Sequence, residues 1–308
     1  MMPWFVPARW RRESGGLTRM GVWDLLFAPL DEAKSMCRAL IACLAVSIGS
    51  APLGVFLVLR RMSLAGDVMT HTLLPGVAVA YLVVGASPAM MLAGGLASGV
   101  VAALLSVVAR RMTLIREDAG LTAVYLIFLA AGILMLAGQG EPEELLHVLF
   151  GNALKIDGGT LVAIVGIVTV TLSVLAVVFR PLVIESFDPA FLGAAGGGVV
   201  VHGIFMVLVM ANLVAGAAAL GTLMTVGLMI MPAITAQFWA ASIGRIIAIA
   251  MAIALVSSFA GLFLAHHGQL PPGPAIVLIV GLAFVVSMTL GPQGGLLHRL
   301  RALPHLEG

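Results

Sequence analysis

Long apolar runs with few charges dominate this chain and constrain its fold more than any other feature. The 308-residue sequence contains about nine of them, at 36–59, 64–84, 88–109, 120–138, 160–179, 198–214, 219–242, 246–265 and 274–291. Most have about the length that an α-helix needs to cross a bilayer. Because backbone polar groups inside a bilayer must be satisfied within the protein, helices suit such runs. The sequence predicts an all-α protein, a polytopic transmembrane bundle of about eight or nine spans.

The composition supports a membrane protein and excludes other classes. The chain is 61% hydrophobic and only 10% charged, whereas soluble domains average roughly 45–50% apolar and 25% charged residues. Its net charge of +2 is too small to indicate a nucleic-acid partner. The sequence has neither a phosphate-binding loop nor a His-Glu-x-x-His phrase, so ATP hydrolysis would have to come from another chain and a metalloprotease is not indicated.

Arginines follow every second apolar run. We use the positive-inside bias to place these loops, and the end of the chain, in the cytoplasm. The phrase Arg180-Pro181 is interpreted as a turn between two spans. The arginines that define the pattern are Arg60, Arg61, Arg110, Arg111, Arg116, Arg180, Arg245, Arg299 and Arg301.

The same pattern divides the chain into three parts. We expect an N-terminal extension and interfacial segment at 1–35, a transmembrane domain at 36–292 and a cytoplasmic tail at 293–308. The first span would then start outside, although the extension carries four arginines. Translation from Met20 instead of Met1, or an additional re-entrant or interfacial segment, would each reconcile the two observations.

Asp67 and His71 lie one helical turn apart near the start of the run at 64–84. Side chains at this spacing share a helix face, and ionisable groups inside a membrane segment indicate a transport pathway or a proton relay. A helix cap or a packed core histidine explains either residue alone about as well, but the pair favours function. Two chains facing each other across a two-fold axis would bring together carboxylates and imidazoles suited to zinc, manganese or iron.

Other polar residues carry weaker signals. Gly66, Pro75 and Gly76 are expected to break the second span, which is typical of backbone that lines a cavity. His202 is expected to be packed or hydrogen-bonded rather than a ligand. Charged outer loops are usually only solvated, so outer metal contacts are a minor hypothesis; their candidates are Glu141, Glu143, Glu144, His147, His266 and His267.

From about Leu30 to Pro292 the chain resembles the membrane permeases of ABC importers for zinc, manganese and iron. The resemblance rests on phrases that occur in the family's order. They are Leu59-Arg60-Arg61-Met62-Ser63, Gly66-Asp67 to His71, Leu74-Pro75-Gly76, Glu117-Asp118-Ala119-Gly120, Leu149-Phe150-Gly151-Asn152, Phe187-Asp188-Pro189, Gly221-Thr222-Leu223 to Ala236, and Pro272-Gly273-Pro274.

This resemblance implies the permease fold of type II ABC importers, the class of the cobalamin importers. It implies a homodimeric channel in the bacterial inner (cytoplasmic) membrane, two cytoplasmic ABC ATPase subunits that bind ATP, and an extracytoplasmic metal-binding protein. Zinc, manganese or iron would be the transported ion, with no cofactor bound permanently.

The resemblance also assigns roles to particular residues. Asp67 and His71 match the family's metal pathway, and the stretch from Phe187 to Gly196 matches the coupling loop that seats in the ATPase. The coupling residues are Phe187, Asp188, Pro189, Gly193 and Gly196. Leu192 precedes Gly193 where the family usually has a basic residue.

Two alternatives remain open from the sequence. A proton-coupled secondary metal carrier could use Asp67 and His71 as a relay without any ATPase. A siderophore- or cobalamin-type ABC permease would share the architecture but move large chelates, whereas an intramembrane Asp/His pair favours a bare ion.

Overall fold

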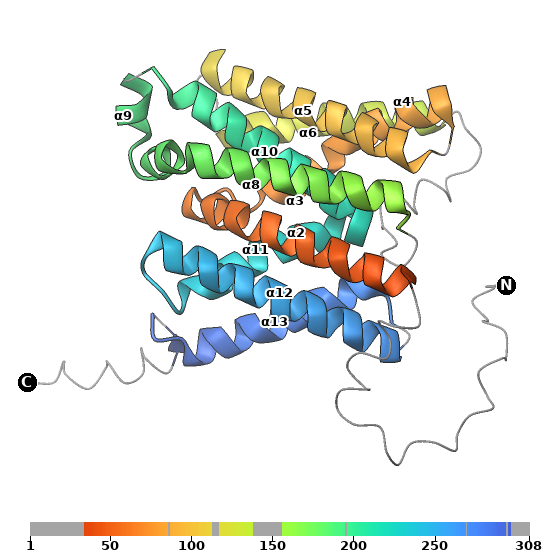
Figure 1. The fold of residues 1–308 in the computed structure, drawn as a ribbon. Coiled ribbons are helices and arrows are strands. Elements are labelled where there is room, and N and C mark those ends of the chain that lie inside the picture. Colours follow the sequence, from red (N-terminus) through yellow and green to blue (C-terminus); the bar gives the residue numbers. More distant parts are fainter. Residues whose placement is uncertain are drawn as a thin grey trace, which may run out of the picture.

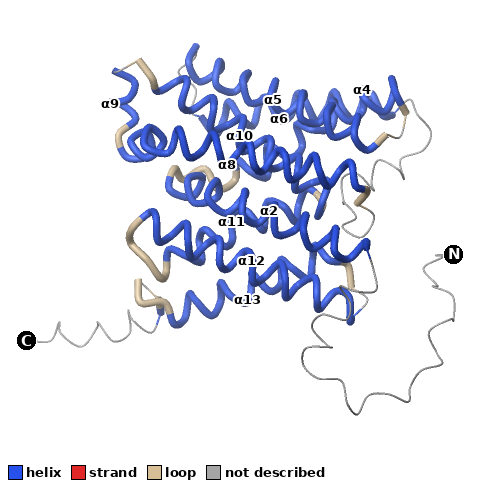
Figure 2. The backbone as a smooth tube through the Cα atoms, in the orientation of Figure 1, coloured by secondary structure: helices blue, strands red, loops and turns tan. Residues whose placement is uncertain are grey.

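The computed structural model describes residues 34–85, 87–112, 117–137, 156–194, 196–268, 270–293 and 295–296. Every regular element in these ranges is a helix, and no strand occurs among them (Figure 2). The N-terminal extension, with both candidate start residues, and most of the predicted tail lie outside the described residues, as do Glu141, Glu143, Glu144 and His147.

The helices follow the predicted apolar runs. Their bounds are α2 Lys34–Leu59, α3 Ala65–Thr70, η1 His71–Leu73, α4 Leu74–Val84, α5 Pro88–Met112, α6 Glu117–Ala137, α8 Gly158–Phe187, α9 Pro189–Ala194, α10 Gly198–Leu220, α11 Thr222–Gln237, α12 Ile243–Gly268 and α13 Pro272–Leu290. Within the described ranges seven helical stretches are long and apolar enough to cross a membrane, and two shorter apolar helices, Ala119–Met135 and Met224–Gln237, occupy the remaining predicted runs. The all-α, multi-span prediction is confirmed.

Helix α2 lies at the centre of the bundle and packs against α8, α10, α11 and α12 (Figure 1). On one side of it α4, α5 and α6 form a group that joins the rest through α5 and α10; on the other side α11, α12 and α13 pack together. Between α4 and α5 the backbones approach closely, because a Cβ on Gly76 would lie 2.0 Å from the Gly94 carbonyl oxygen. Small residues permit such packing where lipid supplies no hydrophobic driving force between helices.

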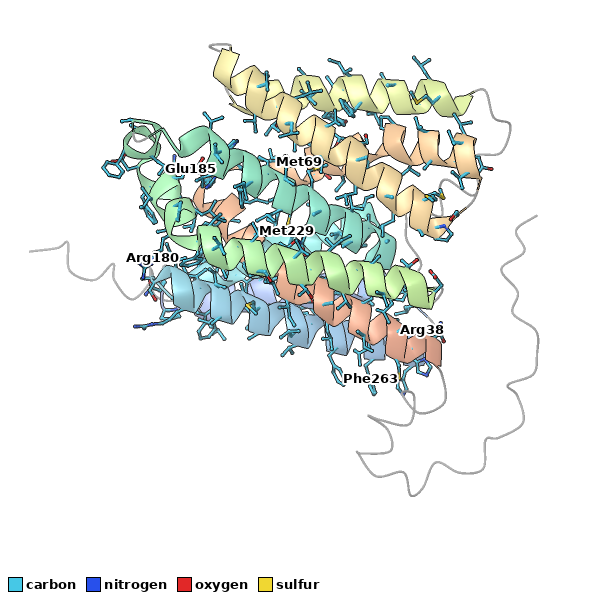
Figure 3. The ribbon with its side chains drawn as sticks, turned by 45° about the horizontal axis from the view of Figure 1, so that its top comes forward. Arg38, Met69, Arg180, Glu185, Met229 and Phe263 are labelled. Carbon is cyan, nitrogen blue, oxygen red and sulfur yellow. The ribbon has the colours of Figure 1, made fainter. Side chains whose placement is uncertain are left out.

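The helix ends that flank the predicted basic loops lie at one end of the bundle (Figure 1). Figure 1 shows α9, the C-terminal ends of α2 and α8, and the start of α12 together at the left. In Figure 3 Arg180 and Glu185 lie towards this end, whereas Arg38 and Phe263 lie at the opposite end. The alternation of basic loops therefore corresponds to one face of the bundle, which we take as cytoplasmic.

One expected turn is absent, and the interpretation of Arg180-Pro181 was wrong. Helix α8 continues through Pro181 to Phe187, so Arg180 lies inside a 30-residue helix. Proline removes one backbone donor, but membrane helices tolerate it because neighbouring groups can satisfy the freed carbonyl. The longer helix carries Glu185 into the bundle, where its side chain is buried.

Candidate functional site

The segment that contains Asp67 begins at a tight turn after α2. The N–H groups of Arg61 and Met62 donate to the carbonyls of Val58 and Leu57 at 3.0 and 2.9 Å, and Arg61 has a φ of 59°. This is the paired hydrogen-bond pattern of a Schellman motif, with a left-handed residue just beyond the helix end. Met62 and Leu57 are both buried in one hydrophobic cluster, so the turn sets the direction in which α3 leaves α2.

The second span is broken at His71, as the sequence predicts. Pro75 has no N–H group to donate to the His71 carbonyl four residues earlier. The Leu74 N–H donates to that carbonyl instead, and this shorter spacing makes His71–Leu73 a 3-10 turn. The result is α3, η1 and α4 in place of one continuous helix, and we call residues 65–84 the broken span.

Three neighbouring helices hold the broken span. A Cβ on Gly66 would lie 2.9 Å from Cε of Met229 in α11, and a Cβ on Gly132 in α6 would lie 2.8 Å from Cβ of Leu74. From α5, the Ser98 hydroxyl donates to the Thr72 carbonyl at 2.6 Å. Met69 and Met229 both lie in the interior between the two ends of the bundle (Figure 3). Irregular backbone at this depth is thus supported by protein rather than by lipid.

The two predicted pathway residues occupy different environments in one chain. Asp67 is exposed, whereas His71 is half-buried, and the His71 ring lies 5.5 Å from the Tyr125 ring of α6 between centroids. Nowhere in the described ranges do three or more His, Cys, Asp or Glu residues gather as a metal site would require. The described part of a single chain therefore supplies two potential ligands here rather than a complete coordination sphere.

The predicted coupling residues lie where α8 gives way to α9. Asp188 separates the helices, and its Oδ1 accepts from the Phe191 N–H at 2.9 Å, while Pro189 opens α9, a position that suits proline. The side chains of Phe187 and Phe191 are 68% and 61% exposed. Two aromatic side chains therefore project from the cytoplasmic end.

The short helix is closed by the two predicted glycines of this stretch. The Gly196 N–H donates to the Gly193 carbonyl at 3.1 Å, and Gly196 has a φ of 78°, which glycine adopts without strain. A Cβ at either position would meet no atom within 4 Å. Backbone conformation at Gly196, not crowding, is what requires glycine in this turn.

A buried charged cluster at the same end was missed by sequence reasoning. Arg60 Nη2 donates to Glu185 Oε2 at 2.9 Å, and Arg60 Nε donates to the Ser186 hydroxyl at 3.2 Å. His202 Nδ1 lies 3.3 Å from both Arg60 Nη1 and Glu185 Oε1, and the guanidinium carbon stands 4.4 Å from the centroid of the Phe205 ring. We call Arg60, Glu185 and His202 the cytoplasmic charge cluster.

The prediction for His202 is confirmed, since it is buried and hydrogen-bonded. Arg60 had been used to orient the chain and as part of a phrase shared with the family, but not as a partner of Glu185. Glu185 could have predicted the cluster from the sequence, because a carboxylate beside an apolar run needs a partner of opposite charge.

At the outer end, His266 and His267 close α12 and are both exposed. The His267 ring lies 4.2 Å from the Phe263 ring and 5.4 Å from the His266 ring, measured between centroids. His267 Nδ1 is 3.0 Å from the Phe263 carbonyl, which engages one of its nitrogens. Outer metal contact by these residues stays a prediction.

Comparisons with known proteins bear on this arrangement. The model of the ABC 3 transport family matches residues 32–291. A manganese import system permease protein, ScaB, of Streptococcus parasanguinis is 30% identical over 265 residues, covering 86% of this chain and 93% of its own. A probable iron transport system membrane protein of Haemophilus influenzae is 28% identical, over 87% of this chain and 97% of its own.

A solved structure shows the same fold. The complex PsaBC from Streptococcus pneumoniae, bound to a Fab, contains a chain that superposes with a TM-score of 0.77 at 29% sequence identity. The match covers 90% of this chain and 98% of that one. The overall arrangement of helices in this chain is therefore that of a known architecture.

Proposed function

Because the chain belongs to the ABC 3 transport family, we propose that it is the permease subunit of an ATP-driven importer for a divalent transition metal. It is a multi-pass protein of the bacterial inner membrane. Manganese and iron occur in the names of its relatives, and zinc shares the same nitrogen and oxygen ligands. The family assignment disfavours both a proton-coupled secondary carrier and a permease for metal chelates.

The exposed carboxylate of Asp67 in the broken span is the observation that carries this proposal. A charged side chain inside a membrane is costly unless it faces a water-filled path or a partner. Half-buried His71 follows one turn later, so an ion that passes this surface meets a carboxylate and an imidazole. Mixed oxygen and nitrogen ligands of this kind suit manganese, zinc and iron, and such a partial site can release its ion again.

A second copy of the chain would complete the site. Two broken spans facing each other would contribute two carboxylates and two imidazoles, and would cover Asp67 from lipid. The permease would then be a homodimer with the ion path between its protomers. Each chain would supply half of the coordination sphere.

ATP would be hydrolysed by partner subunits at the cytoplasmic end. The chain has no phosphate-binding loop of its own, and α9 with the exposed Phe187 and Phe191 presents an apolar surface there. Aromatic side chains of this type anchor protein interfaces. At the opposite end, a metal-binding protein would deliver the ion near the α12–α13 turn and the exposed His266 and His267.

ATP would move the ion by changing the relative stability of two arrangements. ATP can shift the equilibrium between two conformations of the transporter only if it binds those conformations with different affinity. The ATPase subunits would dock at α9, which contacts α8 and α10, and both of these helices contact α2. A change of conformation in the ATPase would therefore move helices that pack against α2. The broken span then opens alternately towards the delivering protein and towards the cytoplasm.

The test is metal uptake into proteoliposomes that contain the permease with its ATPase subunits and delivering protein. We expect ATP-dependent uptake of manganese, zinc or iron, and a loss of at least tenfold with Asp67→Asn or His71→Ala, because each removes one ligand type from both protomers. Assembly of the complex, measured by co-purification, should be unchanged. Uptake that continues without ATP and collapses with the proton gradient would establish the carrier alternative instead.

A further inference from the structure

The cytoplasmic charge cluster joins three helices at the point where the proposed ATPase dock meets the metal path. Arg60 directly follows the last residue of α2, Glu185 lies in the last turn of α8 and His202 lies in the second turn of α10. The side chains of Arg60 and Glu185 are only 8% and 5% exposed. Burial of this kind removes water as an alternative partner, so each charge depends on the others.

The cluster is geometrically specific. Arg60 uses three different nitrogens, one towards Glu185, one towards His202 and one towards Ser186. A guanidinium is a rigid planar fork, and it fits such a set of acceptors in one orientation only. The Phe205 ring under the guanidinium fixes that orientation further. A change in the relative position of α2, α8 and α10 must therefore break or exchange several contacts at once.

His202 offers one such exchange. Its Nδ1 lies at the same distance, 3.3 Å, from Arg60 Nη1 and from Glu185 Oε1. Nδ1 can accept from Arg60 through its lone pair or donate to Glu185 when it carries hydrogen, but it cannot do both. The cluster thus has two alternative pairings built from the same three side chains.

The chain connects the cluster directly to both functional regions. Glu185 precedes Phe187, the first residue of the predicted coupling loop, by two positions, and Arg60 precedes Asp67 by seven. The turn between Arg60 and Asp67 is the hydrogen-bonded Schellman turn. Movement of α8 at the ATPase dock reaches the start of the broken span through one ion pair and one short turn.

We propose that Arg60, Glu185 and His202 are positioning residues that couple ATP-driven movement of α8 and α9 to the broken span. The proposal rests on the proposed function, since it needs an ATPase at α9 and an ion at Asp67. The cluster contacts neither the nucleotide nor the metal. Its role is to keep the cytoplasmic end of α2 moving together with α8 and α10.

The decisive measurement is metal transported per ATP hydrolysed by the full complex in proteoliposomes. Glu185→Gln preserves the size of the side chain but removes the negative charge that pairs with Arg60. We expect assembly and basal ATP hydrolysis to persist, while metal transported per ATP falls about tenfold, the order of a typical coupling between sites. Glu185→Asp, which keeps the charge, should recover part of the ratio.

A double variant separates coupling from stability. Arg60→Met with Glu185→Leu replaces the ion pair by apolar side chains, which commonly preserves or raises stability. We expect this variant to unfold at a temperature near that of the wild type and still to transport about tenfold less metal per ATP. If the double variant transports as much metal per ATP as the wild type, the proposal is overturned and the cluster has only a structural role. This outcome can be read even if Glu185→Gln fails to fold.

A matched control removes another polar contact of α2. Ser258→Ala abolishes the 2.7 Å hydrogen bond between the Ser47 and Ser258 hydroxyls, which joins α2 to α12 away from the cytoplasmic end. The metal transported per ATP hydrolysed by this variant should equal that of the wild type. If the wild-type complex itself moves no metal with ATP, the proposed function fails; if it does and the double variant stays coupled, only this inference fails.

Discussion

At the scale of single residues, two adjacent arginines have different roles. Arg60 is buried in the cytoplasmic charge cluster, whereas Arg61 is exposed and has a φ of 59°. A left-handed conformation costs a residue with a Cβ roughly 1–2 kcal/mol. The Schellman turn between α2 and α3 therefore forms despite a conformational cost at Arg61, because both of its hydrogen bonds and the buried Leu57 and Met62 stabilise it.

Substitution of Arg61 should distinguish backbone conformation from charge. Arg61→Gly and Arg61→Val both remove the charge, but only glycine adopts a positive φ without strain. We expect Arg61→Val to be less stable than Arg61→Gly by about 1–2 kcal/mol. Thermal unfolding of the purified variants measures the difference. Equal stability of the two variants would contradict a left-handed residue at this turn.

At the scale of elements, α8 connects the outer face of the bundle to the coupling region and begins with a capped N-terminus. The Asp157 carboxylate accepts from the Gly159 N–H at 3.0 Å, and it also accepts from the N–H and the hydroxyl of Thr160. The Thr160 hydroxyl bond, with the backbone bonds, holds the pKa of Asp157 below its ordinary value of 3.8 against the opposing effect of desolvation. An N-cap of this type sets where a helix starts.

Removal of this cap should give a pH-dependent loss of stability. A carboxyl group whose pKa is lowered on folding contributes stability above its unfolded pKa, and that contribution is lost as the pH falls through the folded value. We expect Asp157→Ala to cost about 0.5–1 kcal/mol near neutral pH and the difference from wild type to shrink below about pH 4. Thermal unfolding across this range measures it.

Asp157→Asn is the matched control for the cap. Asparagine also caps helices well but does not ionise. Its unfolding temperature should stay near that of the wild type at neutral pH. A difference between Asp157→Ala and wild type that persists unchanged below about pH 3 would show that the carboxylate is not the cap.

At the scale of the whole molecule, one chain leaves the carboxylate of Asp67 uncovered. Asp67 is exposed on a single chain that spans a bilayer, which is unfavourable unless another surface covers it. A two-fold dimer solves this problem with the same surface on both partners. The proposed homodimer therefore rests on where this charge lies.

Cross-linking can test the dimer directly. In a background without Cys37 and Cys43, Asp67→Cys should form a covalent dimer with a short thiol-reactive cross-linker, because the two positions would face each other. Val177→Cys, at a side chain that is 81% exposed on α8, controls for chance collisions. Equal yields at both positions in the assembled complex, or no product at Asp67, would contradict the proposed interface.

Much of the fold could be predicted from the sequence because its signals are local. The lengths of the apolar runs predicted the spans, and the placement of arginines predicted that the basic loops lie at one end of the bundle. Pro75, with Gly66 and Gly76, predicted the broken span. The turn at Arg180-Pro181 was wrong because a proline signal is local, whereas continuation of α8 depends on what its neighbours satisfy. The lone glutamate of that helix showed its partners only once α2, α8 and α10 were placed together.

The sequence by itself determined the class of this protein and its membrane spans, and it singled out Asp67 and His71 as the proposed pathway residues, since these follow from hydropathy, spacing and motif order. Only the tertiary structure decided that Asp67 lies exposed on one chain and that Arg60, Glu185 and His202 meet in one buried cluster between α2, α8 and α10. The reason is physical. Charges more than a hundred residues apart in sequence become partners only when packing brings their helices together and excludes water from between them.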